Sequence, residues 1–391
     1  MEDVFVVSAL RTPFGSFGGS LSDLSAPELA SQVIKELLQR NQLSGEQIDE
    51  VIIGQVLQGG SAQAPARQAM RNAGLPDSVH AMTINKVCGS GLKAMMLAAD
   101  AIALGHSSIV IAGGMESMSK APYALPGARF GQRLGNGEML DLVVYDGLQD
   151  PYSKRHMGEI TEDWVAKHGL SREEQDEFAV RSYRLSQAAV KNGTFQDELV
   201  AVVKKSRKGD ITISEDEEPF RGSIDKLVEL RPVFSKTGTI TAGNASTIND
   251  GAGLAILAGK QAVKSNNLQP LARLVASTTN SIHPDKFAEA PVDAIRSCCA
   301  RAGLQLDDIG LFEINEAFAA VPLVAIKQLG LAADKVNVNG GAVSIGHPIG
   351  ASGGRLVATL LREMKARQQK YGLATLCIGG GEAVAAIFEL V

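Results

Sequence analysis

The chain has 391 residues, which exceeds one ordinary domain and fits either two packed domains or one large α/β unit. Its net charge of −5 argues against nucleic acid as the main partner, and no apolar run approaches the ~18 residues of a membrane span. Four cysteines without a Cys-x-x-Cys spacing form no disulfide framework, and the first residues do not resemble a secretory signal, so a reducing, cytoplasmic setting is expected.

Predicted strands and helices alternate along the first part of the chain and again along the last part. In the first part we expect strands at 4–8, 50–57, 81–87 and 108–113, and helices at 27–40, 64–74 and 90–104. In the last part we expect strands at 273–278, 311–314, 335–338 and 373–378, and helices at 292–302, 317–328 and 352–364. This alternation of short apolar strands with helices predicts mainly parallel sheets that helices cover on both faces.

The two parts also match in local sequence. Gly89-Ser90-Gly91 opens one predicted helix and Ala351-Ser352-Gly353 opens its counterpart. Residues 111–116 likewise resemble residues 377–382. We therefore predict two similar α/β halves related by a pseudo-twofold axis.

A stretch of different character separates the halves. It is rich in Pro and Gly near its start, and Ser171-Arg172-Glu173-Glu174 is a capping box that opens a helix to about residue 191. An irregular insertion of this length is usually functional. Residues 254–257 then form a last strand of the first half. The predicted domains are residues 1–117 plus 249–270, an inserted loop domain at 118–248, and residues 271–391.

Three reactive side chains lie where predicted strands end, which is where α/β proteins bind ligands. Cys88 precedes a long helix, His347 lies at the matching junction of the second half, and Cys377 ends the last predicted strand before three glycines. The N–H groups and dipole at a helix start favour a thiolate, which predicts a lowered pKa and a nucleophilic role for Cys88. For each of the three, a purely structural buried residue is the alternative.

Asn315 ends the predicted strand 311–314, and two roles remain open for it. Its amide can cap the following helix, or it can fix a water or a carbonyl group. The patterns of several other chemistries are missing: the chain has no convincing Gly-x-Ser-x-Gly turn, zinc-ligand spacing, Walker loop or dinucleotide fingerprint. A serine hydrolase, a zinc enzyme and a nucleotide-binding protein are therefore not expected.

Seven motifs in consistent order resemble the thiolase family over nearly the whole chain. They are Asn85-Lys86-Val87-Cys88-Gly89-Ser90-Gly91, Gly113-Gly114-Met115-Glu116-Ser117-Met118, His156-Met157-Gly158, Thr241-Ala242-Gly243-Asn244-Ala245-Ser246, Asn315-Glu316-Ala317-Phe318, residues 346–353 around Gly346-His347-Pro348, and Cys377-Ile378-Gly379-Gly380-Gly381. The resemblance implies a duplicated, five-layered α/β/α/β/α fold with an inserted loop domain.

The resemblance also implies roles for the reactive residues. Cys88 is expected to carry the acyl group, His347 to activate it, and Cys377 to take a proton from the methyl carbon of a second acyl-CoA. Asn315, through a water, and His347 are expected to form one oxyanion hole. The N–H groups of Cys88 and Gly379 are expected to form the other.

Contacts with CoA are implied in the same way, mostly from the inserted loop domain. They are assigned by motif to His156, Met157, Arg221, Phe234, Ala242, Ser246, Phe318 and Leu148. Met157 is similar to the residue of the short-chain, acetoacetyl-CoA type. Phe287 departs from the family, since Phe287-Ala288-Glu289-Ala290-Pro291 stands where many members have Met-Gly-x-Gly-Pro, and it is expected to narrow or reshape the acyl pocket.

The implied activity is that of an acetyl-CoA C-acetyltransferase, with acyl-CoA as the partner, no metal and no separate cofactor, since CoA is part of substrate and product. A degradative 3-ketoacyl-CoA thiolase for longer chains is the alternative. A decarboxylating ketoacyl synthase is disfavoured because Cys377 stands where a second His would be, and the intact Cys88, His347 and Cys377 disfavour a non-catalytic carrier. Family members are dimers or tetramers, and residues 120–147 are a candidate contact for a homotetramer.

Overall fold

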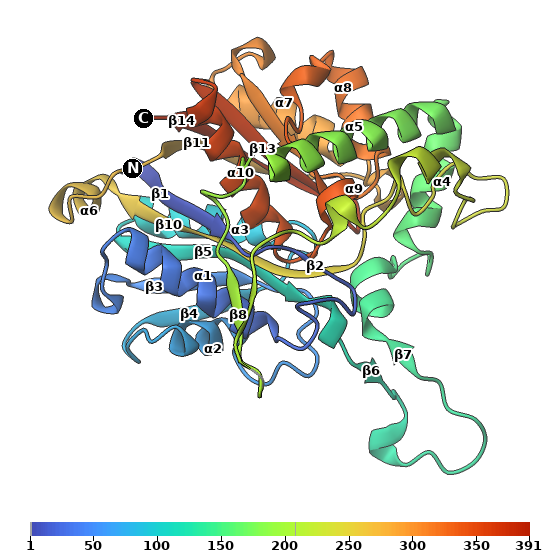
Figure 1. Cartoon of the computed structure of the whole chain (residues 1–391), viewed down its shortest axis with the longest axis horizontal. Helices are drawn as coiled ribbons and strands as arrows, with labels where there is room; N and C mark the ends of the chain where they lie inside the picture. Colours follow the sequence, from blue (N-terminus) through green and yellow to red (C-terminus); the bar gives the residue numbers. More distant parts are fainter. Residues whose placement is uncertain (1, 208) are drawn as a thin grey trace.

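Two helices, α3 (Ser90–Ala103) and α10 (Ser352–Ala366), lie side by side at the centre of the molecule, between two groups of strands (Figure 1). The computed structural model describes residues 2–207 and 209–391. One large buried apolar cluster contains residues of both helices and of strands from both groups. The central helices are therefore the shared core of the two halves.

The strands of each half follow one another in the same order. In the first half the order is β1 (Val4–Arg11), β10 (Asn249–Gly259), β5 (Ile109–Ser117), β3 (Glu50–Gly54) and β4 (His80–Ile84). In the second half it is β11 (Ala272–Ser281), β14 (Glu382–Leu390), β13 (Tyr371–Ile378) and β12 (Leu311–Ile314). The two series meet where β1 and β11 pair over a short antiparallel stretch.

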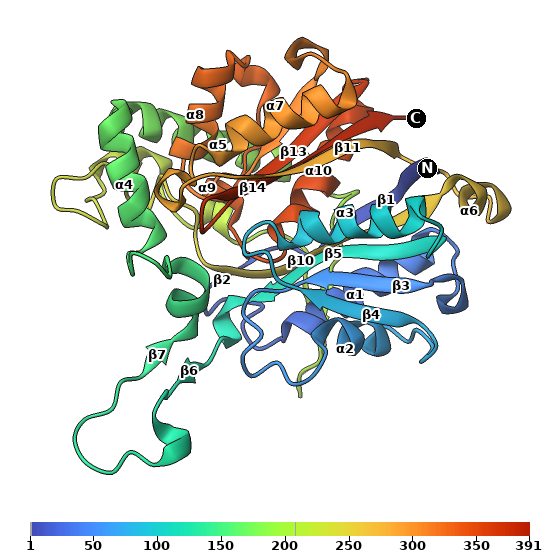
Figure 2. The same cartoon turned by 180° about the vertical axis from the view of Figure 1, so that it is seen from behind.

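Outer helices complete the layers. Helices α1 (Ala26–Arg40) and α2 (Pro65–Asn72) cover the outer face of the first group of strands, and α7 (Ala290–Ala302) and α8 (Ala320–Leu329) cover the second (Figure 2). Each outer layer has its own buried apolar cluster. The structure thus confirms the predicted duplicated α/β/α/β/α fold. Its predicted strand at 254–257 is also present, as part of β10 inside the first half.

The prediction of mainly parallel sheets is wrong. Strand β10 is antiparallel to β1 and β5, and β14 is antiparallel to β11 and β13, whereas only β3, β4 and β5 and the pair β12–β13 run parallel. The turn at residues 379–381 joins β13 directly to β14, and a hairpin connection gives antiparallel strands. Strand β10 arrives from the insertion, so no crossover helix sets its direction.

The predicted strand at 335–338 does not form. Only Val336 pairs with β12, through a bridge to Phe312. Asn337 has a φ of +47°, which ends the extended conformation, and its side-chain amide replaces main-chain pairing by hydrogen bonding both the N–H and the C=O of Ile314 at 2.8 Å. Helix α8 also begins later than predicted, at Ala320, because Phe318 pairs with Ala245.

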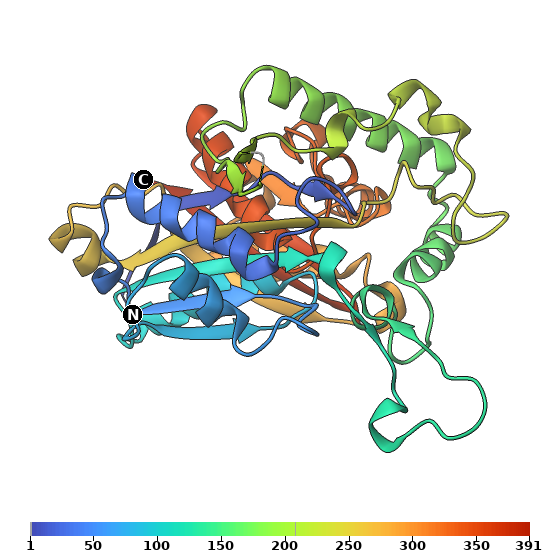
Figure 3. The same cartoon turned by 60° about the horizontal axis from the view of Figure 1, so that its bottom comes forward.

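The segment between the halves contains elements of its own. The predicted helix from Ser171 is present as α5 (Arg172–Lys191), and α4 (Met157–His168) precedes it without having been predicted. An arm that includes β6 (Tyr123–Ala124) and β7 (Leu140–Asp141) projects from the body (Figure 3). The remaining short elements are β2 (Gly15–Ser16), β8 (Val202–Lys204), β9 (Ile211–Ile213), α6 (Lys260–Ser265) and α9 (Ala342–Ile345). Within the described ranges, every helix is too short or too polar to cross a membrane.

Glycines let the first turns of α3 and α10 touch through their backbones. A Cβ on Gly353 would lie 2.2 Å from the main-chain nitrogen of Leu92, and a Cβ on Gly91 would lie 2.9 Å from the carbonyl oxygen of Gly350. No side chain fits between the two helix starts. The residues just before them, Cys88 and His347, are therefore held close to the same point.

We expect Gly353→Ala to destabilise the protein by about 1–3 kcal/mol, because the added methyl group meets main-chain atoms that cannot rotate away. Gly127→Ala is the matched control, since a Cβ there meets no atom within 4 Å and the φ of −86° suits alanine. Urea denaturation measures both effects. Equal unfolding midpoints for the two variants would contradict the proposed backbone contact.

Candidate active site

Cys88 lies in a tight turn between β4 and α3. Val87, immediately before it, has a φ of +46°, a region that costs a β-branched residue on the order of 1–3 kcal/mol. The side-chain oxygen of Asn85 accepts a hydrogen bond from the N–H of Val87 at 2.9 Å, and Ser90 Oγ accepts one from the N–H of Lys86 at 2.8 Å. These bonds hold the strained turn and fix the position of the sulfur.

His347 is held from three sides in the loop before α10, and its side chain is buried. Its N–H donates to Asn249 Oδ1 at 2.9 Å, its Nδ1 lies 2.5 Å from Ser352 Oγ, and its Nε2 lies 3.3 Å from Asn315 Nδ2. Because α8 starts at Ala320, Asn315 is not the cap of that helix, and its amide lies next to the imidazole of His347 instead.

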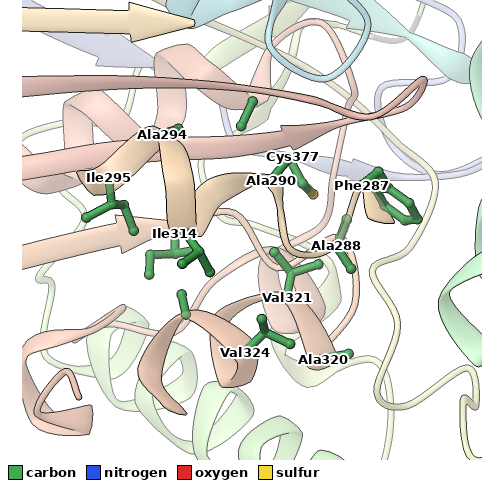
Figure 4. Packing of buried hydrophobic residues seen from close by; sticks show 14 of the residues in the cluster. Phe287, Ala288, Ala290, Ala294, Ile295, Ile314, Ala320, Val321, Val324 and Cys377 are labelled. Atoms are coloured by element: carbon green, nitrogen blue, oxygen red, sulfur yellow. The ribbon is translucent and has the colours of Figure 1, made fainter. Parts of the chain in front are cut away.

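Cys377 is the last residue but one of β13, and its side chain is buried in the apolar cluster that also contains Phe287 (Figure 4). The turn that follows contains Gly380 and Gly381 with φ of +92° and +85°. Gly379, the first residue of that turn, directs its N–H toward the sulfur of Cys88. The end of β13 and the turn after it therefore supply a thiol and also a hydrogen-bond donor to the thiol of the first half.

Burial dominates the electrostatics of these groups. It raises the pKa of the Cys88 thiol to about 11, although hydrogen bonds from the N–H groups of Gly379 and Cys88 act in the opposite direction. Burial also raises the pKa of Cys377 well above its usual range and lowers that of His347 to about 3. The expectation of a lowered Cys88 pKa is wrong, because the loss of water outweighs the helix start. At rest the site is neutral: two thiols and an uncharged imidazole.

A cavity of about 460 Å³ opens in front of these residues. Its walls include thirteen of the fourteen predicted site residues: Cys88, Leu148, His156, Met157, Arg221, Phe234, Ala242, Ser246, Phe287, Phe318, His347, Cys377 and Gly379. The remaining one, Asn315, does not line the cavity but contacts His347, which does. Residues from both halves and from the insertion thus meet around one space.

Aromatic rings form one side of this cavity. His156 stacks on Phe234 with ring centres 4.9 Å apart, and Phe318 packs edge-on against both Phe234 and Phe287. Burial lowers the pKa of His156, and its Nδ1 accepts a hydrogen bond from the N–H of Gly158, so this ring is a neutral helix cap for α4. Arg221, paired with Glu218, is a half-exposed cation on the cavity wall.

Sequence reasoning missed several wall residues. Met118 and Ile349 lie within motifs that were singled out, so their position was available. Of the two residues that hold His347, Ser352 lies within the motif at 346–353 and Asn249 lies three residues after the motif at 241–246. Thr241, Ala245 and Ala317 also lie within recognised motifs. The others gave no signal because they lie outside the motifs, in irregular segments or far from them along the chain: Phe17, Gly147, Val233, Thr247 and Ile248.

Comparison with known proteins gives consistent matches over the whole chain. The sequence model described as thiolase, N-terminal domain, matches residues 4–261, and thiolase, C-terminal domain, matches residues 268–390. The chain is 50% identical to acetyl-CoA acetyltransferases of Chromobacterium violaceum, over 99% of both chains, and of Cupriavidus necator, over the full length of both.

Solved structures agree. The acetyl-CoA acetyltransferase of Bacillus anthracis superposes with a TM-score of 0.97 at 42% identity, and human mitochondrial 3-ketoacyl-CoA thiolase with 0.96 at 40% identity. Each match covers 100% of this chain and 99% of the other. The duplicated fold and these relatives define an acyltransferase. The chain belongs to the thiolase family.

The pKa values predict how Cys88 reacts in the enzyme without substrate. Because the pKa of Cys88 is about 11 and that of His347 is about 3, His347 is uncharged and Cys88 is a thiol at neutral pH. The fraction of Cys88 present as thiolate therefore increases about tenfold for each unit by which the pH is raised, up to about pH 11. We expect alkylation of Cys88 by iodoacetamide, followed by peptide mass spectrometry, to accelerate accordingly between pH 7 and pH 9. Cys88→Ser removes the labelled peptide as a control. A rate that is already constant between pH 6 and pH 8 would instead indicate a thiolate–imidazolium pair.

Proposed function

We propose that the protein is an acetyl-CoA C-acetyltransferase, which condenses two acetyl-CoA into acetoacetyl-CoA and CoA, reversibly and through an acetyl-Cys88 intermediate. The observation that carries the proposal is the meeting of Cys88, His347 and Cys377 on one cavity whose walls include Met157, Phe287 and other apolar residues. The acetyl-CoA acetyltransferases at 50% identity support the same reaction.

In the first half-reaction the acetyl group moves to Cys88. His347 Nε2 takes the proton of the Cys88 thiol, and the sulfur attacks the thioester carbon. The N–H groups of Cys88 and Gly379, which already face this sulfur, stabilise the negative charge that forms on the thioester oxygen. The departing CoA sulfur takes the proton of Cys377. The site then holds acetyl-Cys88, an imidazolium and the Cys377 thiolate.

In the second half-reaction the Cys377 thiolate acts as the base and the His347 imidazolium as a hydrogen-bond donor. The Cys377 thiolate takes a proton from the methyl group of a second acetyl-CoA, and the enolate oxygen is held by His347 Nε2–H and by a water on Asn315. Asn315 Oδ1 is buried and has no hydrogen-bond partner among the described residues, which leaves it free to accept from that water. The enolate attacks acetyl-Cys88, and the released Cys88 thiolate recovers its proton from His347. Two products leave in turn, which is ping-pong kinetics.

The rest of the cavity is suited to CoA, which enters as part of the substrate rather than as a separate cofactor. Arg221 offers its guanidinium to the phosphates, and the stacked His156 and Phe234 offer an apolar wall to the pantetheine chain. Leu148, Ala242, Ser246 and Phe318 line the same path. We propose that residues 118–248 are the inserted domain that supplies most of these contacts, between domains of residues 1–117 plus 249–270 and 271–391.

We also propose an oligomeric state and a cellular compartment for the protein. The arm exposes Tyr123, Leu125, Phe130, Leu134 and Met139, an apolar surface that supports a homo-oligomer, dimer or tetramer. A cytoplasmic role in lipid metabolism fits the reaction.

Mass spectrometry after mixing with acetyl-CoA tests the intermediate. We expect a mass increase of one acetyl group on the Cys88 peptide, and none in Cys88→Ala. Cys377→Ala should still accept the acetyl group, but its rate of acetoacetyl-CoA synthesis should fall by about 10³-fold or more, because no base remains for the methyl proton. An unlabelled Cys88 in an active enzyme would exclude this mechanism.

Acyl-chain length separates the proposal from a degradative 3-ketoacyl-CoA thiolase. Phe287 is buried against Phe318 at the cavity wall, and Met157 lies beside Gly379, so both limit the space beyond the acyl carbon. We expect faster thiolysis of acetoacetyl-CoA than of a 3-ketoacyl-CoA with a long chain. Phe287→Ala should shift the ratio of the two kcat/KM values toward the long substrate by about tenfold or more. Faster turnover of the long substrate by the unmodified enzyme would favour the degradative alternative.

A further inference from the structure

We propose that Ser352 is a positioning residue that keeps the proton of the His347 ring on Nδ1 and so leaves Nε2 unprotonated, able to take a proton within the cavity that Cys88 also lines. No role was assigned to Ser352 by the motifs. It opens α10, its side chain is buried, and its Oγ lies 2.5 Å from His347 Nδ1. The consequence for catalysis rests on the proposed acetyl transfer, whereas the tautomer itself does not.

The hydrogen bonds around the ring form one consistent chain. In the amide orientation of this structure, Asn315 Nδ2 lies 3.3 Å from His347 Nε2, and because an NH₂ group can only donate, Nε2 is the acceptor in this arrangement. A neutral ring with an acceptor at Nε2 has its proton on Nδ1, and this N–H donates to Ser352 Oγ. The Ser352 hydroxyl in turn donates to the carbonyl oxygen of Pro348 at 3.0 Å. In this series of hydrogen bonds, each donated proton has a single acceptor.

Ser352 is suited to both charge states of the ring. When Nε2 takes the proton of Cys88, the imidazolium still carries its proton on Nδ1, and Ser352 still accepts it without rotating. A hydroxyl also differs from the carboxylate that holds the histidine of a Ser-His-Asp triad, because it adds no negative charge. The imidazolium is therefore little stabilised, which suits a base that must return its proton in every cycle.

The equivalent serine of the first half holds a different group in a similar way. Ser90 opens α3, and its Oγ donates to the carbonyl oxygen of Val87 at 2.7 Å while it accepts from the N–H of Lys86. Ser90 thus fixes the backbone turn before Cys88. At the same place in the second half, Ser352 has the ring of His347 as its donor in place of a main-chain N–H.

The tautomer is measured directly by long-range ¹H–¹⁵N spectra of protein labelled with ¹⁵N-histidine, with His347→Asn used to assign the signal. The unmodified protein should show a protonated Nδ1 and an unprotonated Nε2. Ser352→Ala should shift the equilibrium toward the Nε2–H form, and Ser352→Thr, which keeps the hydroxyl, should restore Nδ1–H. Ser90→Ala should leave the spectrum of His347 unchanged.

The rate of acetylation of Cys88 in a single turnover gives the second readout. We expect Ser352→Ala to slow it by about 10- to 100-fold with little change in KM, and Ser352→Thr to recover most of the loss. Ser186→Ala is the matched control: that side chain is also buried and its hydroxyl also donates to a main-chain carbonyl oxygen a few residues earlier, but it is not bonded to His347.

The outcomes separate the two proposals. An unchanged His347 spectrum in Ser352→Ala, or an acetylation rate within about twofold of the unmodified enzyme, would overturn the role of Ser352. If acetyl-CoA fails to label Cys88 in the unmodified enzyme, the proposed function fails, but the spectra still decide which residue sets the tautomer.

Discussion

The backbone contact between the starts of α3 and α10 is the constraint on which the active site depends. Gly91 and Gly353 allow the two helices to approach without intervening side chains, and the loop that carries His347 lies against the first half at Gly114. Glu116 strengthens the same junction: its carboxylate accepts hydrogen bonds from the N–H groups of Val56, Leu57 and Gly350. The reacting groups of the two halves are held next to one cavity because the backbones that support them touch.

The same close packing explains the electrostatics. A junction built of glycine backbone and apolar side chains excludes water, and this raises the pKa of both thiols while it lowers that of His347. A single charged group is destabilised at this site because it lacks water. A proton transfer between two of the groups creates a positive and a negative charge together, and the two charges stabilise each other. The geometry therefore favours proton transfers coupled to bond formation over a permanently charged nucleophile.

Most features determined by neighbouring residues in the sequence were predicted correctly, whereas several features determined by residues far apart in the sequence were not. Motifs at strand ends placed Cys88, His347 and Cys377 at matching junctions, and the repeat predicted the duplicated fold. Strand direction was mispredicted because β10 and β14 pair with strands that no crossover connects to them. The pKa of Cys88 was also mispredicted, since a helix start is visible in sequence, whereas the burial that outweighs it comes from residues elsewhere in the chain, among them Val143 and Ile349.

The missing strand at 335–338 is a difference between the two halves, which otherwise share the same order of strands. Val336 still pairs with β12 at the place that β4 has beside β3, but Asn337 turns its side chain, rather than its backbone, to Ile314. Asn337 also donates to Glu316, which neighbours Asn315. Regular pairing in the first half leads from β4 directly into the strained turn of Cys88. In the second half the irregular segment is used to fix residues 314–316 beside the imidazole. The departure from symmetry therefore lies where the two halves need different chemistry, a thiol on one side and a base with its amide on the other.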